Sequence, residues 1–101
     1  MDGAELLRAA ADRLEVLAGR TPPGDWRIEG LLATRPEVVA HRDDGGTEHV
    51  AEARAGTAAW IAALSPAVAP SLAVWLRAEA DAPSPSTAAL ALARTLLDRL
   101  P

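Results

Sequence analysis

EVVAHRDDGGTEHVAE, residues 37–52, is the segment from which the fold class of this 101-residue chain follows. Its centre, Asp43-Asp44-Gly45-Gly46, is a strong hairpin signal, because a tight turn between two strands needs residues that accept a positive φ. The flanking segments 37–42 and 47–52 are therefore predicted to pair as antiparallel strands.

A further strand is predicted upstream of the hairpin. Apolar and polar side chains alternate with a period of two from Trp26 to Leu31, as a half-buried strand requires. Pro36 disfavours the α region for Arg35 and favours a turn before the hairpin. The strand region 26–52 is predicted to form a three-stranded antiparallel meander.

A helix is predicted over residues 3–18, before the strands. Asp2 and Glu5 have the spacing of a capping box. Gly19 suits the position just after a helix, and the two prolines that follow it prevent continuation. One apolar stripe runs along this helix at steps of three and four residues, and it consists of Leu7, Ala10, Leu14 and Leu17.

Three helices are predicted after the strands, at about 55–64, 67–80 and 86–99. The middle helix has two possible starts: Ser65 and Pro66 form a good N-cap and first helical residue, but Pro70 suits the first turn equally well. Ser86 is the expected N-cap of the last helix. The predicted fold is α+β: an N-terminal helix, the three-stranded antiparallel meander, and three helices packed on one face of the sheet. A chain of this length is expected to form a single small domain over residues 1–101.

The composition excludes several classes of function. Half of the residues are hydrophobic, which excludes disorder for most of the chain, and the net charge of −4 argues against direct binding to nucleic acid. The absence of cysteine removes thiolate chemistry and suits the cytoplasm, where we expect the protein. The charge-free run Ala55–Leu76 is interrupted by Gly56, Pro66 and Pro70, so we expect two helices there and no membrane span. No secretory signal is expected.

The run TAAWIAALSPAV, residues 57–68, leads into LAVWL at residues 72–76. This pattern of an aromatic residue, Ile-Ala-Ala, a pair ending in Pro and then a Leu-rich helix resembles a tail motif of small uncharacterised proteins encoded by actinomycetes and bacteriophages. Residues 21–26, TPPGDW, are similar to a Thr-Pro-Gly-Pro-Trp sequence in that group, and residues 89–94, ALALAR, are similar as well. The resemblance implies an accessory or phage-derived gene and brings no activity or site residues.

The hairpin carries the one polar cluster that suggests chemistry, because His41 and His49 lie near carboxylates and could ligate a divalent metal or act as acid and base. Two registers are open. Pairing of Arg42 with Thr47 puts His41 opposite Glu48, with His49 on the other face, whereas pairing of Arg42 with Glu48 puts the two histidines opposite each other. Two ligands do not complete a metal site, so a solvated hairpin tip is the favoured interpretation.

Other catalytic patterns are absent from the sequence. No serine has the glycine-flanked elbow of the common hydrolases, and Gly45-Gly46 lacks the lysine and the glycine spacing of a phosphate loop. Ser71 is the only polar residue of the 67–80 helix before Arg77, which is too few for a DNA-recognition helix. We therefore predict no catalytic residues and no bound cofactor.

Tryptophans and flanking leucines suggest protein binding instead. Trp60 is expected in the core, and Trp75 is expected to be partly exposed. The first and last helices carry apolar residues beside their main stripes, more than one packing partner covers. The sequence thus predicts a non-enzymatic, accessory or phage-derived interaction domain that forms a homodimer or binds one protein partner, and the alternative is a small metal-binding protein or enzyme using His41 and His49. The candidate partner-binding residues are Trp75, Leu6, Leu92 and Leu96.

Overall fold

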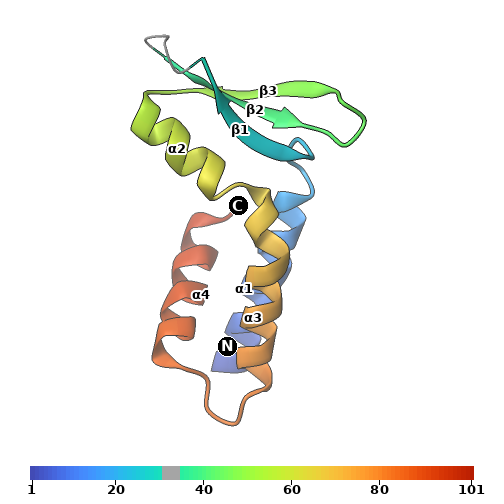
Figure 1. The fold of residues 1–101 in the computed structure, drawn as a ribbon. Helices are drawn as coiled ribbons and strands as arrows, with labels where there is room; N and C mark the ends of the chain where they lie inside the picture. The colour runs from blue at the N-terminus through green and yellow to red at the C-terminus, as the bar shows by residue number, and fades with distance from the viewer. Residues whose placement is uncertain (31–34) are drawn as a thin grey trace. The chain divides into compact units, whose positions relative to one another are not determined.

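A computed structural model describes residues 1–30 and 35–101 of the chain. An N-terminal helix is followed by a three-stranded antiparallel sheet and then by three helices, which confirms the predicted α+β class (Figure 1). Leu31, in the first predicted strand, lies outside the described residues. The elements are α1 (Gly3–Ala18), β1 (Asp25–Glu29), β2 (Glu37–His41), β3 (Thr47–Glu52), α2 (Ala55–Ala63), a 3₁₀ turn (Pro66–Val68), α3 (Ala69–Asp81) and α4 (Thr87–Arg99).

The chain, expected as a single domain, forms two compact units. A helical unit consists of residues 1–20 and 68–101, and a sheet unit consists of residues 21–67. Of the three helices that follow the strands, α2 packs on β1 and β2, whereas α3 and α4 pack with α1. The buried residues of α3 and α4 belong to the same cluster as those of α1, so these three helices share one core.

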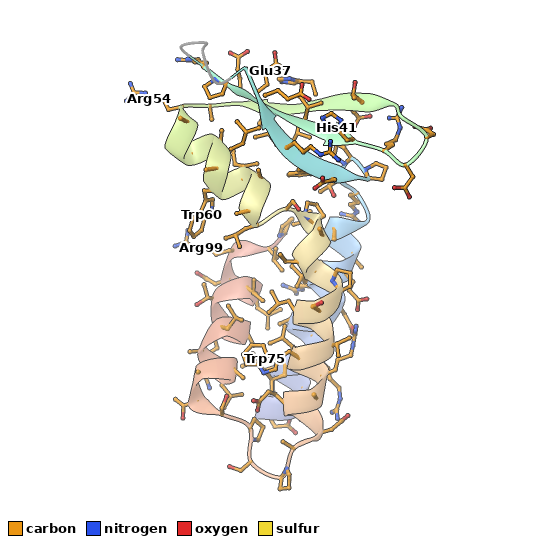
Figure 2. The ribbon with its side chains drawn as sticks, in the orientation of Figure 1. Glu37, His41, Arg54, Trp60, Trp75 and Arg99 are labelled. Carbon is orange, nitrogen blue, oxygen red and sulfur yellow. The ribbon has the colours of Figure 1, made fainter. Side chains whose placement is uncertain are left out.

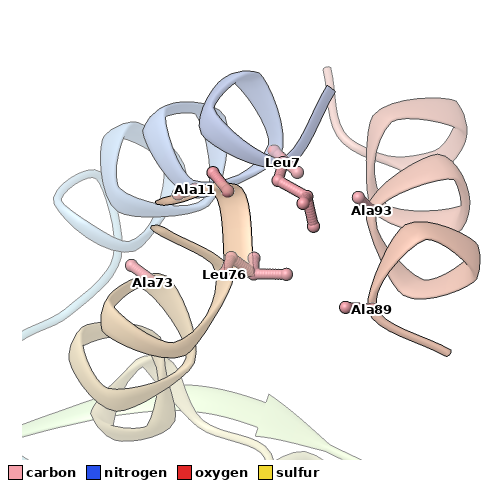
Figure 3. Close-up of a cluster of buried hydrophobic side chains, with 8 residues drawn as sticks. Leu7, Ala11, Ala73, Leu76, Ala89 and Ala93 are labelled. Atoms are coloured by element: carbon pink, nitrogen blue, oxygen red, sulfur yellow. The ribbon is translucent and has the colours of Figure 1, made fainter. Parts of the chain in front are cut away.

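The core of the helical unit is built from alanines around two leucines. Leu7 of α1 and Leu76 of α3 are fully buried, and they point into the space beside Ala89 and Ala93 of α4 (Figure 3). Alanine faces let the helices approach closely, and Leu7 and Leu76 are the largest fully buried side chains of this unit. The buried cluster contains Leu7, Ala10, Ala11, Ala73, Leu76, Ala80, Ala89 and Ala93.

Side-chain N-caps begin α1 and α4 at the residues where they were predicted. The Asp2 Oδ1 atom accepts a hydrogen bond from the Glu5 backbone N–H at 2.8 Å, and the Ser86 Oγ atom accepts one from the Ala89 N–H at 3.1 Å. Each cap satisfies a donor that has no partner inside its helix. The hydrogen bond from Glu5 also lowers the pKa of the Asp2 carboxyl group.

Both prolines near the start of α3 are accommodated. Pro66 opens the 3₁₀ turn, and α3 begins at Ala69 with Pro70 in its first turn. A proline is tolerated there because the first N–H groups of a helix have no intrahelical acceptor. Ser65 does not cap α3; its Oγ accepts a hydrogen bond from the Ala67 N–H at 3.3 Å.

Ion pairs join one side of α3 to α1. Arg77 Nη2 lies 2.8 Å from Asp12 Oδ1 and also contacts Glu15, and Arg8 Nη2 lies 2.7 Å from Asp81 Oδ1. The hydrogen bonds to Asp12 and Glu15 raise the pKa of the Arg77 guanidinium group. Exposed pairs such as these contribute little to stability, but they show which side of α3 faces α1.

The sheet has the order β1-β2-β3, with Val39 of β2 paired to His49 of β3 and His41 paired to Thr47. The loop therefore spans residues 42–46, and neither register considered for Arg42 is correct. Arg42 belongs to the turn: its carbonyl accepts from the Gly45 N–H at 3.0 Å, and its own N–H donates to the Gly46 carbonyl at 2.8 Å. Gly45 has a φ of 86°, the positive value that the turn sequence predicted.

Candidate functional site: the apolar face of helix α2

The two histidines lie on one face of the sheet. Val39 pairs with His49 and is two residues from His41 on the same strand, so all three side chains point to the same side. Each imidazole contacts a glutamate and not the other histidine. His41 Nε2 lies 2.6 Å from Glu29 Oε1, and His49 Nδ1 lies 3.3 Å from Glu37 Oε2.

These contacts form two separate His–Glu pairs that link neighbouring strands. Within residues 1–30 and 35–101, no group of three His, Cys, Asp or Glu side chains is placed to hold a metal ion. A zinc site uses at least three protein ligands, so this face of the sheet does not provide one in the described chain. The pairs are suited to positioning side chains across the strands.

The hairpin tip is organised by its own hydrogen bonds. The Gly46 N–H donates to Asp44 Oδ1 at 2.7 Å, and Arg42 Nε lies 3.6 Å from the same oxygen. The Gly46 hydrogen bond, with the positive charge of Arg42, lowers the pKa of the Asp44 carboxyl group. Asp44 therefore serves the turn conformation, as expected of a structural tip.

Helix α2 exposes Trp60, contrary to the prediction, and its C-cap residue Leu64 is exposed as well. Trp60 is 69% exposed and Leu64 is 54% exposed, while Ala58 is fully buried. Figure 2 shows Trp60 on the side of α2 away from the strands. The prediction of a buried Trp60 was wrong because α2 has apolar residues on every side, so its sequence does not distinguish the inner face from the outer one.

We use the name α2 face for the exposed side of this helix, formed by Gly56, Trp60, Ala63 and Leu64. Spacings of four, three and one residues bring them onto one side of the helix. A Cβ atom added at Gly56 would meet no heavy atom of the described chain within 4 Å. The face therefore has a large indole ring one turn away from an open position with no side chain.

Charge is confined to one end of this helix. Arg54 is the exposed N-cap residue, and it forms no side-chain capping bond to the described backbone. The sequence then contains no charged residue until Arg77. The α2 face is thus apolar along its whole length, with a cation at its N-terminal end.

The predicted partner-binding residues lie in the helical unit. Trp75 is 40% exposed, which confirms its expected partial exposure. Its position two residues before Arg77 puts it on a different side of α3 from the ion pairs with α1. Leu6, Leu92 and Leu96 are partly buried and pack against the alanine–leucine core, so their own unit covers much of the surface expected for a partner.

The exposure of Trp75 could be predicted from the sequence, whereas that of Trp60 and Leu64 was not. One signal was available, since Gly56 precedes Trp60 by one helical turn and a glycine inside a helix contributes no packing to the core. The stretch Ala55–Asp81 is also long and apolar enough to cross a membrane by length and composition alone. It consists of α2, the 3₁₀ turn and α3, and such a stretch is weak evidence for a membrane span.

Comparisons with protein-family models, with curated proteins and with solved structures find no match to this chain. The α2 face offers apolar contact area without charges, whereas the sheet face that carries His41 and His49 offers two separate His–Glu contacts.

Proposed function

We propose that this protein is a non-enzymatic interaction domain that associates with itself. The observation that carries the proposal is the 69% exposure of Trp60 on an uncharged helix face that also exposes Leu64. Tryptophan is among the residues most enriched at the energetic centres of protein interfaces. A protein surface that covers the α2 face would remove both side chains from water without burying a charge.

The energy available from Trp60 is sufficient to matter. A tryptophan buries roughly 150–250 Å² when covered, so the exposed 69% of Trp60 corresponds to about 100–170 Å². At about 25 cal/mol per Å² of apolar area, covering it contributes about 3 kcal/mol before the costs of association. Leu64 adds to this gain on the same side of the helix.

The proposal also covers the protein's location, the type of gene that encodes it and its assembly. The net charge of −4 opposes direct binding to nucleic acid, and we propose a cytoplasmic protein from an accessory or phage-derived gene. A homodimer is the favoured assembly because two-fold dimers are the commonest closed oligomers. A different protein as the single partner is the other form of the same proposal.

The second candidate is a metal-binding protein or enzyme that uses His41 and His49. It is supported by the 2.6 Å contact between His41 and Glu29, which would orient an imidazole, but it lacks a third ligand among the described residues. Elemental analysis of purified protein distinguishes the candidates. Stoichiometric zinc, iron or manganese that survives dialysis would favour the metal protein over the interaction domain.

Light scattering after size exclusion tests self-association directly. At micromolar concentration the wild-type chain is expected to report twice its mass of 10.5 kDa. The dimer fraction should rise with concentration, as mass action requires. A mass of one chain that stays constant up to high concentration would overturn self-association.

A further inference from the structure

We infer that a second copy of this chain occupies the α2 face, and that the two α2 helices pack antiparallel across a two-fold axis with each Trp60 over the partner's Gly56. This inference rests on the self-association proposed above and specifies its surface and geometry. It uses three observations on the sheet unit: the exposed indole, the open glycine and the charge at one end of the helix.

The shape of the α2 face is complementary to itself. Trp60 projects from the face, and Gly56, one turn away, has nothing within 4 Å of where a side chain would begin. A two-fold interface must match one surface patch with the same patch on the partner. Gly56 and Trp60 lie equally far from the level of Ala58 along the helix axis. An antiparallel pair with its two-fold axis at that level therefore places each indole ring over the partner's glycine.

The position of Arg54 on α2 also favours antiparallel packing of the two helices. Arg54 stands at the N-terminal end of the helix, where its own helix dipole disfavours a cation, and the last turn has no basic residue. In the antiparallel pair, Arg54 lies opposite Ala62 of the second copy, because both are four residues from Ala58. A cation is favourable at that C-terminal end. A parallel pair would place the two arginines beside each other.

Other occupants fit the face less well. An acidic peptide or a nucleic acid would find no cation between Arg54 and Arg77 in the sequence. A lipid surface could accept Trp60, but it would leave the open position at Gly56 unexplained. The nine-residue helix offers a small interface, and interfaces that bury less than about 1,200 Å² in total are typically weak, so the dimer is expected to dissociate when the chain is diluted below micromolar concentration.

Sedimentation or light scattering across a dilution series tests the inference with matched variants. Trp60→Ala removes the indole, and Gly56→Leu fills the position under the partner's ring without a clash in the single chain. Each is expected to weaken the dimer by about ten-fold or more, the scale of a lost interface anchor. Val74→Ala and Ala91→Leu shorten an apolar side chain and enlarge a small one at exposed sites of α3 and α4, and they should leave the dissociation constant within about two-fold.

A separate variant tests whether the two helices pack antiparallel or parallel. Arg54→Gln should weaken an antiparallel dimer, because it removes a cation from the partner's helix end, whereas it should strengthen a parallel one by removing a repulsion. A tighter dimer with this variant would overturn the antiparallel geometry. Circular dichroism of every variant, expected to match wild type, separates lost association from lost folding.

The remaining results separate the two proposals. If Trp75→Ala dissociates the dimer and Trp60→Ala does not, self-association stands and the α2 face is the wrong surface. A wild-type chain that is monomeric at every concentration overturns both proposals. If that monomer binds phosphatidylcholine vesicles with a blue shift of its fluorescence that Trp60→Ala abolishes, the face takes a lipid surface and the inference is overturned.

Discussion

Replacement of Leu7 by Ala should remove a large part of the stability of the helical unit. Leu7 and Leu76 are fully buried, whereas the other members of this core are alanines. Alanine side chains have no rotamers with which to move into a vacated space, so only the partly buried leucines packed around the core could fill it. We predict that these leucines keep their positions and that the cavity left by the substitution persists.

The magnitude follows from the atoms removed. Leu→Ala deletes three buried carbon atoms, and at about 0.8 kcal/mol for each the transfer cost is about 2.4 kcal/mol. A cavity that does not collapse adds about 24 cal/mol per Å³, or about 2 kcal/mol for a volume of roughly 80 Å³. The sum of about 4–5 kcal/mol is a large share of the 5–15 kcal/mol that is typical for the total stability of a protein.

Urea denaturation followed by the far-ultraviolet helical signal, at one fixed protein concentration, measures this loss. Val16→Ala is the matched control, because Val16 lies on the same helix and is 54% exposed. It should change the free energy of unfolding by less than about 0.5 kcal/mol. A loss below about 1.5 kcal/mol for Leu7→Ala would show that the core rearranges, and it would refute the argument from rigid alanine faces.

Three further predictions concern stability. Trp60→Ala should lower the free energy of unfolding of the single chain by less than about 1 kcal/mol, measured at protein concentrations below the dimer dissociation constant. A loss of about 3 kcal/mol or more would show that Trp60 is part of the core. Ser86→Ala should cost about 1 kcal/mol through loss of its N-cap, with Ser84→Ala as the neutral control, and equal effects of the two would contradict the capping role. The lowered pKa of Asp44 means that its contribution is present above the ordinary value of 3.8 and is lost as the pH falls through its value in the folded chain. Unfolding measured from pH 5 to pH 2 should show less loss for Asp44→Asn than for wild type, and parallel curves would contradict it.

Features set by neighbouring residues could be predicted from the sequence. Asp2 and Ser86 cap their helices as expected because a cap needs only a short polar side chain and an N–H three residues later. Gly45 adopts the positive φ that the turn requires. Each of these features depends on a few consecutive residues, so tertiary packing does not change it.

Features set by packing could not be predicted in the same way. The hairpin register depended on whether Arg42 belongs to the strand or to the turn, and the hydrogen bonds to Gly45 and Gly46 decide for the turn. Periodicity located the helices but not which surfaces they cover. Leu6 and Leu92 looked like surplus surface on isolated helices, and they pack instead against the core of their own unit.

The orientation of α2 is the strongest structural argument for association. The helix turns Ala58 and Ala62 toward the inside and leaves Trp60 and Leu64 exposed. A helix that served only to cover the sheet would gain more by burying the indole, because burial energy grows with apolar area. Small inward residues allow α2 to lie close to the sheet, but they contribute less burial energy than the larger side chains would. That energy would become available only when another surface covers the α2 face, and the proposed self-association would supply that surface and stabilise this unit.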